Sequence, residues 1–256
     1  MKQTPIASRS LLVKPLGRKA YGSITHLPGS RLGPGDHRCD LGQARICTVS
    51  SRDRHDRILV TEKLDGANTA VVKHHGTILA LSRAGYRTDH SLYAHHQMFA
   101  AWVLSRQDRF DALLNEGEQL SGEWLALAHG TRYMLSHDPW VVFDGFDAAH
   151  RRWLWAQLED RVGDQFVLPR VLHAGGSLSV EVALAMLGAT GFHGAQDVPE
   201  GAVWRVERKG QVDFVAKFVR SDKVDGRYLP EITGGDPVWN WSPDTGNTTA
   251  SKEGPL

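Results

Sequence analysis

Hydrophobic positions recur along the chain at two spacings, which predict where strands and helices form. Short apolar and β-branched runs with alternating polar positions, bounded by turn residues, predict strands. Apolar residues three to four positions apart predict helices. The predicted strands are residues 57–64, 68–73, 78–82, 119–125, 140–146, 202–208 and 212–220. The predicted helices are residues 92–104, 109–114, 153–162 and 180–187, the last with Ser179 as its N-cap.

The turns between these elements predict how the strands pair. Asp65-Gly66 and His75-Gly76 separate the first three strands, which predicts an antiparallel meander. Lys209-Gly210 joins the last two strands as a hairpin. Residues 21–42 are rich in Pro-Gly turns and are predicted to be loop. Because helices fall between antiparallel strands, the pattern predicts one α+β domain.

Charge and composition divide the chain into three predicted parts. Residues 1–19 are basic, since the first acidic residue is Asp36, and we interpret them as a flexible leader. Residues 20–229 form the predicted domain. Residues 230–256 are rich in Gly, Pro, Thr and Ser, which predicts a flexible tail.

Overall composition narrows the class of protein. The chain has 256 residues, 41% hydrophobic and 23% charged, with a formal net charge of +1, which is ordinary for a globular protein and excludes a polycation. No apolar run of about 18 residues is present, so no membrane partner is expected. Two cysteines, Cys39 and Cys47, suit a reducing compartment, and we expect a cytoplasmic location. His37 near Cys39 invites a zinc site, but structural zinc normally needs paired ligand motifs.

The string Glu62-Lys63-Leu64-Asp65-Gly66-Ala67-Asn68 carries the strongest chemical signal. A lysine at the end of an apolar strand is a candidate nucleophile, because burial or a nearby cation lowers the pKa of its amine. Asp65 is placed to orient that amine or accept its proton. Alone, however, Lys-x-Asp-Gly more often marks an exposed hairpin, so the interpretation depends on other segments.

Those segments follow in a fixed order, and together they resemble the covalent nucleotidyltransferase superfamily. They are Ser82-Arg83-Ala84-Gly85, Gly122-Glu123-Trp124, Trp140-Val141-Val142-Phe143-Asp144-Gly145, Pro199-Glu200-Gly201-Ala202-Val203 and Val215-Ala216-Lys217-Phe218-Val219-Arg220. With its Lys-x-Asp-Gly-x-Asn string, the chain resembles ATP-dependent RNA ligases. The resemblance implies an antiparallel-sheet nucleotidyltransferase domain with inserted helices, of the DNA-ligase adenylation or ATP-grasp-like type.

The resemblance also implies roles near the lysine. Lys63 would attack the α-phosphate of ATP and form a lysyl-AMP phosphoramidate, with Asp65 and Lys217 as further catalytic residues. Glu62 and Asn68 would contact the nucleotide. Asn68 stands where DNA ligases usually carry arginine, which favours the RNA-ligase branch.

Four other matched residues would complete the nucleotide site. Arg83 would hold ribose or the end phosphate, and Glu123 would meet the ribose hydroxyls. Phe143 would stack on adenine, although alone it is better interpreted as a core residue. Glu200 would bind Mg²⁺ (or Mn²⁺), with Glu207 as a rival that lacks the following glycine.

The last segment departs from the family pattern. Many members have Lys-x-Lys there, whereas this chain has Val215 before Lys217, so the duty of one lysine is unassigned. We expect Arg220 to compensate. The lead-in at residues 26–30 also resembles small RNA ligases, but receives no role.

The implied reaction joins RNA ends in three steps through lysyl-AMP, with ATP as the AMP donor. The partners would be RNA 5′-phosphate and 3′-hydroxyl ends, with DNA as a further substrate to test. Phosphate contacts are expected from arginines near the motifs, namely Arg83, Arg87, Arg132 and Arg220. The pairs His74-His75 and His95-His96 are predicted to be solvated surface.

Two alternatives remain open. The first is a minimal DNA-nick ligase or an end-adenylating enzyme. DNA ligases and capping enzymes of the superfamily append an oligonucleotide-binding barrel, and the roughly 36 residues after Arg220 are expected to be too few for one. The second is a non-catalytic nucleotide- or RNA-binding module, which has little reason to keep Lys63 together with Glu123, Glu200 and Lys217.

Overall fold

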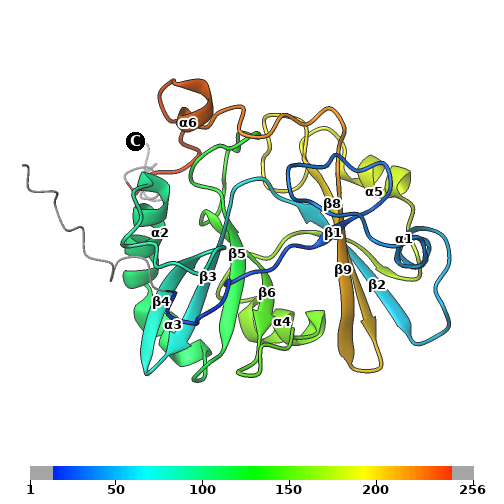
Figure 1. Ribbon diagram of the computed structural model, residues 1–256, viewed down its shortest axis with the longest axis horizontal. Helices are drawn as coiled ribbons and strands as arrows, with labels where there is room; N and C mark the ends of the chain where they lie inside the picture. Colours follow the sequence, from blue (N-terminus) through cyan, green and yellow to red (C-terminus); the bar gives the residue numbers. More distant parts are fainter. Residues whose placement is uncertain (1–13, 244–256) are drawn as a thin grey trace, which may run out of the picture.

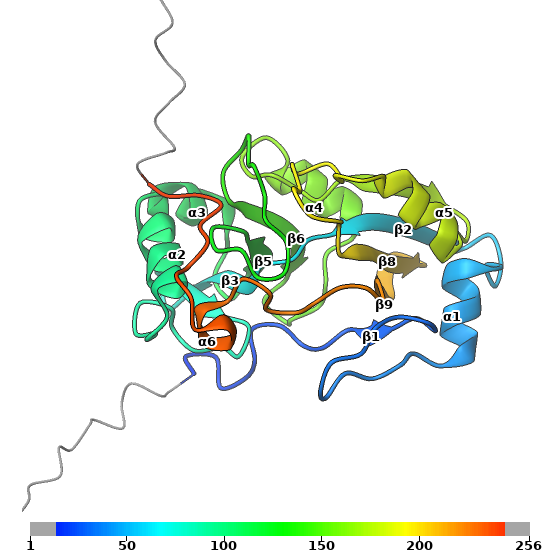
Figure 2. The same ribbon diagram turned by 90° about the horizontal axis from the view of Figure 1, so that it is seen from above.

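The structure is a computed structural model that describes residues 14–243. Two sheets lie side by side, and helices pack against both of them (Figures 1 and 2). The α+β prediction is confirmed, because the strands pair almost entirely antiparallel.

The four-stranded sheet has the order β4-β3-β5-β6. Its strands are β3 (Ala67–His74), β4 (Thr77–Ser82), β5 (Gln119–Trp124) and β6 (Trp140–Phe146). The helices beside it are α2 (Ala94–Leu104), α3 (Gln107–Leu113) and α4 (Trp155–Val162). A core of large aromatic side chains fills the space between them, including Phe99, Trp102, Phe110, Trp124 and Trp140. These rings meet mainly edge-to-face or tilted, as aromatic pairs prefer.

The five-stranded sheet has the order β1-β9-β8-β2-β7. Its strands are β1 (Thr25–His26), β2 (Asp56–Lys63), β7 (Val171–Gly175), β8 (Gly201–Arg208) and β9 (Gln211–Val219). Only the short β1 runs parallel to its neighbour, β9. Helices α1 (Leu41–Thr48) and α5 (Val180–Leu187) contribute to its smaller aliphatic core.

The chain crosses from one sheet to the other at the Lys63–Ala67 string. β2 ends at Lys63 in the five-stranded sheet, and β3 begins at Ala67 in the four-stranded sheet. The predicted meander is therefore wrong at its first turn, because in the described chain β2 pairs with β7 and β8 rather than with β3. A Cβ on Gly66 would lie 2.5 Å from the Trp124 carbonyl oxygen, so the crossing needs glycine.

Most predicted strands and helices are confirmed within a few residues. The sequence analysis missed β1, α1 and β7, which are short or lie at a sheet edge. Asp40 caps α1 by accepting a hydrogen bond from the Gln43 N–H, a capping pattern that turn-rich surroundings concealed.

The predicted tail is ordered over its described part. Pro230–Thr233 forms α6, and Trp241 packs against Trp124 with their ring centroids 5.8 Å apart. The Asn240 side chain accepts a hydrogen bond from the Tyr133 N–H and donates one to the Leu125 carbonyl. The predicted tail therefore contains a short helix and packing contacts up to residue 243, while residues 244–256 and 1–13 lie outside the described part, and the division of the chain at residue 230 stays a prediction. Within residues 14–243, no helix combines the length and apolar character needed to span a membrane.

Candidate active site

A cavity of about 1000 Å³ opens where the two sheets meet. Lys63 and Glu200 reach it from the five-stranded sheet, and Asn68 and Glu123 reach it from the four-stranded sheet. Most of the predicted site residues line this one cavity: Glu62, Lys63, Asp65, Asn68, Arg83, Arg87, Glu123, Phe143, Glu200 and Lys217. Residues spread over 155 positions of sequence are therefore brought together by the sheet crossing.

The Lys63 amine forms an ion pair at the floor of the cavity. Its Nζ lies 2.6 Å from Glu200 Oε2 and 3.2 Å from the Leu64 carbonyl oxygen. Strand register explains the pair, because Lys63 lies opposite Gly201 and Glu200 immediately precedes that glycine. Burial acts to lower the pKa of the amine, but the negative charges of Glu200 and Glu123 outweigh it and raise the pKa above its ordinary value. The expectation of a lowered pKa is wrong for the free protein.

Two buried carboxyl groups share the charge of Lys63. Glu123 Oε1 accepts a hydrogen bond of 3.0 Å from the Gly66 N–H, which ties β5 to the crossing. Burial raises the pKa of Glu123 to about 8, against the opposing effect of the Lys63 charge. Burial likewise raises the pKa of Glu200. Burial thus disfavours the ionised form of both carboxyl groups, and a further cation nearby would stabilise that form.

The donor set fits a divalent ion that is held partly by phosphate. Among residues 14–243, no group of three or more His, Cys, Asp or Glu side chains is arranged to hold a metal alone. Mg²⁺ commonly binds through one or two carboxylates, with substrate phosphates and water completing its shell. Glu200 and Glu123 supply such oxygens. Glu207, the rival to Glu200, instead accepts a hydrogen bond from the Trp155 N–H at the start of α4.

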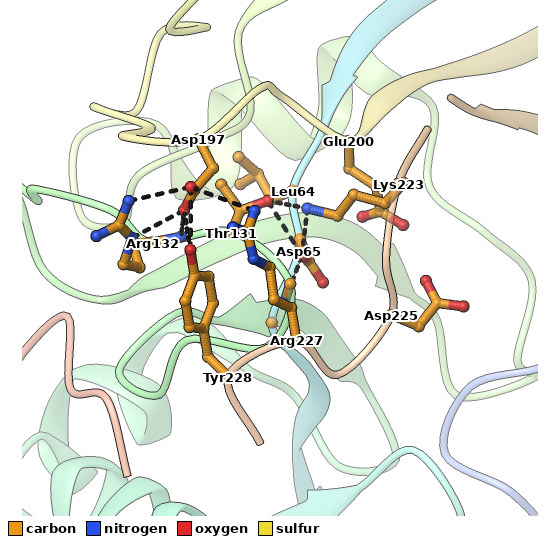
Figure 3. A network of polar contacts seen from close by, with 12 residues as sticks. Leu64, Asp65, Thr131, Arg132, Asp197, Glu200, Lys223, Asp225, Arg227 and Tyr228 are labelled. Carbon is orange, nitrogen blue, oxygen red and sulfur yellow. Dashed lines mark hydrogen bonds and ion pairs between the residues drawn. The ribbon is translucent and has the colours of Figure 1, made fainter. Parts of the chain in front are cut away.

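Asp65 forms an ion pair with Lys223 (Figure 3). Its Oδ2 lies 2.7 Å from Lys223 Nζ and also accepts hydrogen bonds from the Gly130 N–H and the Thr131 hydroxyl. Burial acts to raise the pKa of Asp65, but the Lys223 charge outweighs it and the pKa is lowered. Asp65 also raises the pKa of the Lys63 amine through its negative charge, so its part in orienting that amine stays a prediction.

Lys223 is a site residue that sequence reasoning missed. Only 8% of it is exposed, and its amine also contacts the Thr131 hydroxyl. The residue follows Arg220-Ser221-Asp222 in a polar stretch without a recognisable motif. No local pattern distinguishes it from a surface lysine, because its burial depends on a loop from another part of the chain.

Lys217 forms the second cationic group near Lys63. Burial and the positive charge of Lys63 lower the pKa of Lys217. Its Nζ lies 3.7 Å from Asp36 Oδ1, and Asp36 Oδ2 lies 3.0 Å from His26 Nε2. His26 Nδ1 is 2.7 Å from the Ser30 hydroxyl. The lead-in segment, which the sequence left without a role, therefore positions Lys217 through Asp36.

An aromatic and polar wall lines another part of the cavity. Phe143 is half-buried and meets Tyr21 edge-to-face, with ring centroids 5.2 Å apart. Asn68 Oδ1 is buried without a hydrogen-bond partner among residues 14–243. Arg83 is exposed and donates to the Ser23 hydroxyl. A flat ring beside an unused acceptor suits a purine that carries an amino group.

Val215 stands where many RNA ligases have a lysine, and Arg220, which was expected to compensate, does not line the main cavity. Val215 lines the cavity, and its register partner on β8 is Arg205, which lines the cavity too. The Arg205 guanidinium is buried and bonded to Asp144 and to the Phe143 carbonyl. Arg220 instead pairs with Asp222 beside a second cavity of about 480 Å³. The cation nearest to the Val215 position across the strands is thus Arg205.

The remaining predicted residues have other partners. Glu62 lies on the opposite face of β2 from Lys63, and its carboxylate accepts a hydrogen bond from the Phe192 N–H. Burial raises the pKa of Glu62 to about 7. Arg87 pairs with Asp89 at the cavity rim. Arg132 pairs with Asp197 on the neighbouring surface and is not among the described residues that line the main cavity (Figure 3).

Two minor interpretations are also settled by burial. His95 is only 7% exposed and lines the cavity, so the prediction of solvated surface is wrong for the His95-His96 pair. Cys39 and Cys47 are buried free thiols, and within residues 14–243 no cluster around them is arranged to hold zinc.

Comparison with known proteins matches this arrangement to one family. The RNA ligase family model matches residues 56–219, more than half of the chain and nearly the whole span of the motifs. The chain belongs to the RNA ligase family. That confirms the resemblance noted from the motifs. No curated protein matches the chain.

One solved structure shares this fold at low identity, and two others have lower similarity. A Naegleria gruberi RNA ligase mutant solved with ATP and Mn has a TM-score of 0.50 and 17% identity, over 79% of this chain and 61% of that one. The RNA ligase of the same organism, solved with PPi, has a TM-score of 0.47 and 17% identity, over 86% of this chain and 62% of that one. An archaeal ATP-dependent RNA ligase has a TM-score of 0.46 and 18% identity, over 65% of this chain and 43% of that one. This chain therefore spans about half of the length of these relatives.

Proposed function

We propose that this RNA ligase family member uses ATP to store AMP on Lys63 and then joins RNA 5′-phosphate and 3′-hydroxyl ends. The observation that carries the proposal is the position of the Lys63 amine. It lies on the floor of a cavity beside two carboxyl groups, with a second lysine within electrostatic range. That combination provides a nucleophile, oxygen ligands for a metal, and positive charge for phosphate.

In the first step, the neutral Lys63 amine attacks the α-phosphorus of ATP. The P–N bond forms as the bond to the β-phosphate oxygen breaks, pyrophosphate leaves with the electron pair, and the attacking nitrogen releases its proton to solvent. Lys217 stabilises charge on the α-phosphate, and Phe143 and Asn68 hold the adenine. Glu200 would hold a magnesium or manganese ion, which would neutralise charge on the phosphates.

The second and third steps return the lysine to its starting state. An RNA 5′-phosphate oxygen attacks the phosphorus of lysyl-AMP, forming a 5′–5′ pyrophosphate linkage while the P–N bond breaks and the amine regains a proton. The 3′-hydroxyl oxygen then attacks the 5′-phosphate and expels AMP, and its proton goes to solvent. Positioning of the reacting groups is the main contribution of the protein to each in-line displacement.

The ion pair of Lys63 gives the first step a built-in requirement. The ammonium held by Glu200 is not nucleophilic, so it must lose a proton before attack. Any positive charge that neutralises Glu200 weakens the interaction that keeps this proton bound. ATP binding with its cation and activation of the lysine are therefore coupled through one carboxylate.

A ligation assay tests the proposal and separates RNA from DNA substrates. The full chain with ATP and Mg²⁺ is given 5′-phosphorylated RNA, and separately a nicked DNA duplex, and the joined product is measured. We expect joined RNA from the wild type and none from Lys63→Ala. Lys73→Ala, whose lysine pairs with Asp111 outside the cavity, is the matched control and should ligate normally.

Three results would contradict the RNA-ligase assignment. Joining of nicked DNA without joining of RNA identifies a DNA-nick ligase. Accumulation of adenylated 5′ ends without joined product identifies an end-adenylating enzyme. ATP binding without any transfer of AMP identifies a nucleotide-binding module.

A further inference from the structure

We propose that a histidine-lined arm of the main cavity binds the base of the RNA nucleotide that carries the reacting 5′-phosphate. The inference rests on the proposed function, and it assigns a second nucleoside site beside the one for AMP. The arm is lined by residues 90–93, 95 and 96 around the start of α2, by His129, and by residues 225, 226, 229 and 232, the last of which lies in α6.

The arm belongs to the same cavity as Lys63. Figures 1 and 2 show α6 beside α2, although the two helices lie far apart in the sequence. His129 lines the same cavity, and its ring centroid lies 5.9 Å from that of His95. A nucleotide with its base in the arm would therefore share one cavity with the AMP stored on Lys63.

Aromatic rings line the arm almost continuously. Tyr93 is 52% exposed, and its ring centroid lies 5.6 Å from those of both His95 and His96. The His95 ring lies 5.9 Å from His129. Aromatic faces of this kind bind any nucleobase by stacking, since every base has a π-face. A half-exposed tyrosine beside buried rings is therefore suited to hold an unpaired base.

The charge of the arm favours a base over a phosphate. Burial lowers the pKa of His95 to about 3 and that of His96 to about 4, so both imidazoles are neutral near pH 7. Burial also lowers the pKa of His129. At the rim, Arg87 pairs with Asp89 and Asp225 pairs with Arg31, which leaves little net charge. Lys217 and Arg83, which also line the cavity, are proposed to contact the AMP instead.

Hydrogen-bonding capacity and size agree with a nucleoside. His129 Nε2 is buried without a partner among the described residues, so it is available to a base or ribose. The cavity of about 1000 Å³ is at the upper end of the range of about 300–1,000 Å³ for pockets that hold one drug-sized molecule. AMP alone leaves room for a second nucleoside.

A discharge assay tests the site. Purified Lys63–AMP protein is mixed with 5′-phosphorylated RNA whose first nucleotide carries a base, or with RNA whose first nucleotide is abasic, and loss of AMP from the protein is timed. We expect the abasic end to slow discharge by about five- to hundred-fold, the worth of one base–aromatic stack. Tyr93→Ala should slow discharge of the normal RNA by a similar factor relative to lysyl-AMP formation, and the abasic end should slow that variant no further.

Two variants serve as controls. Tyr93→Phe keeps the ring and should restore discharge. Leu104→Ala removes an exposed side chain at the far end of α2 and should match the wild type. Equal slowing of formation and discharge in Tyr93→Ala would overturn the proposal, and so would discharge that is indifferent to the first base.

A binding measurement keeps the inference separable from the catalytic proposal. RNA with 2-aminopurine as its 5′-phosphorylated first base should lose fluorescence on binding the wild type or Lys63→Ala, because stacking quenches it. Tyr93→Ala should quench it less. If the wild type forms no lysyl-AMP, the proposed function fails, but the loss of 2-aminopurine fluorescence still tests whether the arm binds a base. Equal quenching by Tyr93→Ala would overturn the site even when the ligase reaction proceeds.

Discussion

At the scale of single residues, the state of the Lys63 proton controls the first chemical step. Glu123 contributes to the raised pKa of the amine, so removal of its charge lowers that pKa. For Glu123→Gln at saturating ATP, we expect the pH of half-maximal lysyl-AMP formation to fall by about one unit. Single-turnover rates from pH 6 to 11 measure it, a range that extends above the ordinary pKa of a lysine amine, about 10.4. Glu116→Gln, which changes an exposed carboxylate, should leave the midpoint in place, and an unmoved or raised midpoint in Glu123→Gln would contradict the account.

The Asp65–Lys223 pair allows stability and activity to be separated. Lys223→Met leaves the buried Asp65 carboxylate without its cation, and we expect a loss of about 3–5 kcal/mol in unfolding free energy. Adding Asp65→Asn removes the unpaired charge and should recover most of that stability. Urea unfolding and lysyl-AMP formation are measured on the same samples. If the double variant regains full stability and full activity, the pair has no role in placing the Lys63 loop.

The sequence predicted which residues line the cavity better than it predicted which partners their side chains contact. Ordered motifs placed Lys63, Glu123, Glu200 and Lys217 in one cavity, because each is adjacent to a strand end that the sheet crossing brings together. The partners of those groups were not predictable. Asp65 forms an ion pair with Lys223, and Glu62 accepts a hydrogen bond from the Phe192 N–H. Both contacts depend on loops that are distant in the sequence.

At the scale of elements, β2 is held in register at its other end by an ion cluster. Asp56 begins β2, and its carboxylate binds the guanidinium groups of Arg52 and Arg208, the latter at the end of β8. Asp56→Asn removes the charged acceptor from both, and we expect a loss of about 2 kcal/mol in unfolding free energy at pH 7.

The pH dependence of this cluster distinguishes it from a simple packing effect. Burial opposes ionisation of Asp56, but the two arginines lower its pKa to about 2. Its stabilisation is therefore fully present above the unfolded pKa near 3.8 and is lost as pH falls through about 2. The difference between wild type and Asp56→Asn, from urea melts, should hold steady from pH 7 to 5 and shrink below pH 4. If the difference in unfolding free energy between the two proteins stayed constant down to pH 2, the effect of Asp56→Asn would come from packing rather than from charge.

Periodicity identified elements but not their assignment to sheets. The strands at residues 57–64 and 68–73 were recognised, yet the intervening Asp65-Gly66 was interpreted as a hairpin turn. A tight two-residue turn and a crossing between sheets use the same residue types, because both need a close backbone approach. Only the contact between Gly66 and the Trp124 carbonyl distinguishes them.

At the scale of the whole molecule, buried neutral histidines should make stability depend on pH near neutrality. Burial lowers the pKa of His95 to about 3 and of His96 and His193 to about 4. The unfolded chain binds these protons near pH 6.5 and the folded chain does not, so stability falls as pH drops below 6.5. We expect up to about 1.4 kcal/mol lost per pH unit for each histidine.

Urea unfolding at pH 7, 6 and 5 measures this loss. His193→Gln should reduce the slope of stability against pH, whereas His55→Gln, which changes an exposed residue, should not. Stability that stays level from pH 7 to 5 would show that these imidazoles are protonated in the folded protein.

The central claim is that Lys63 becomes covalently linked to AMP. The most direct measurement is the intact mass of the full chain after incubation with ATP and Mg²⁺, for wild type, Lys63→Ala and the control Lys73→Ala. We predict a gain of one AMP in the wild type and in Lys73→Ala, and none in Lys63→Ala. An unchanged mass in wild-type protein that was free of AMP at the start, or an adduct that persists in Lys63→Ala, would contradict the account.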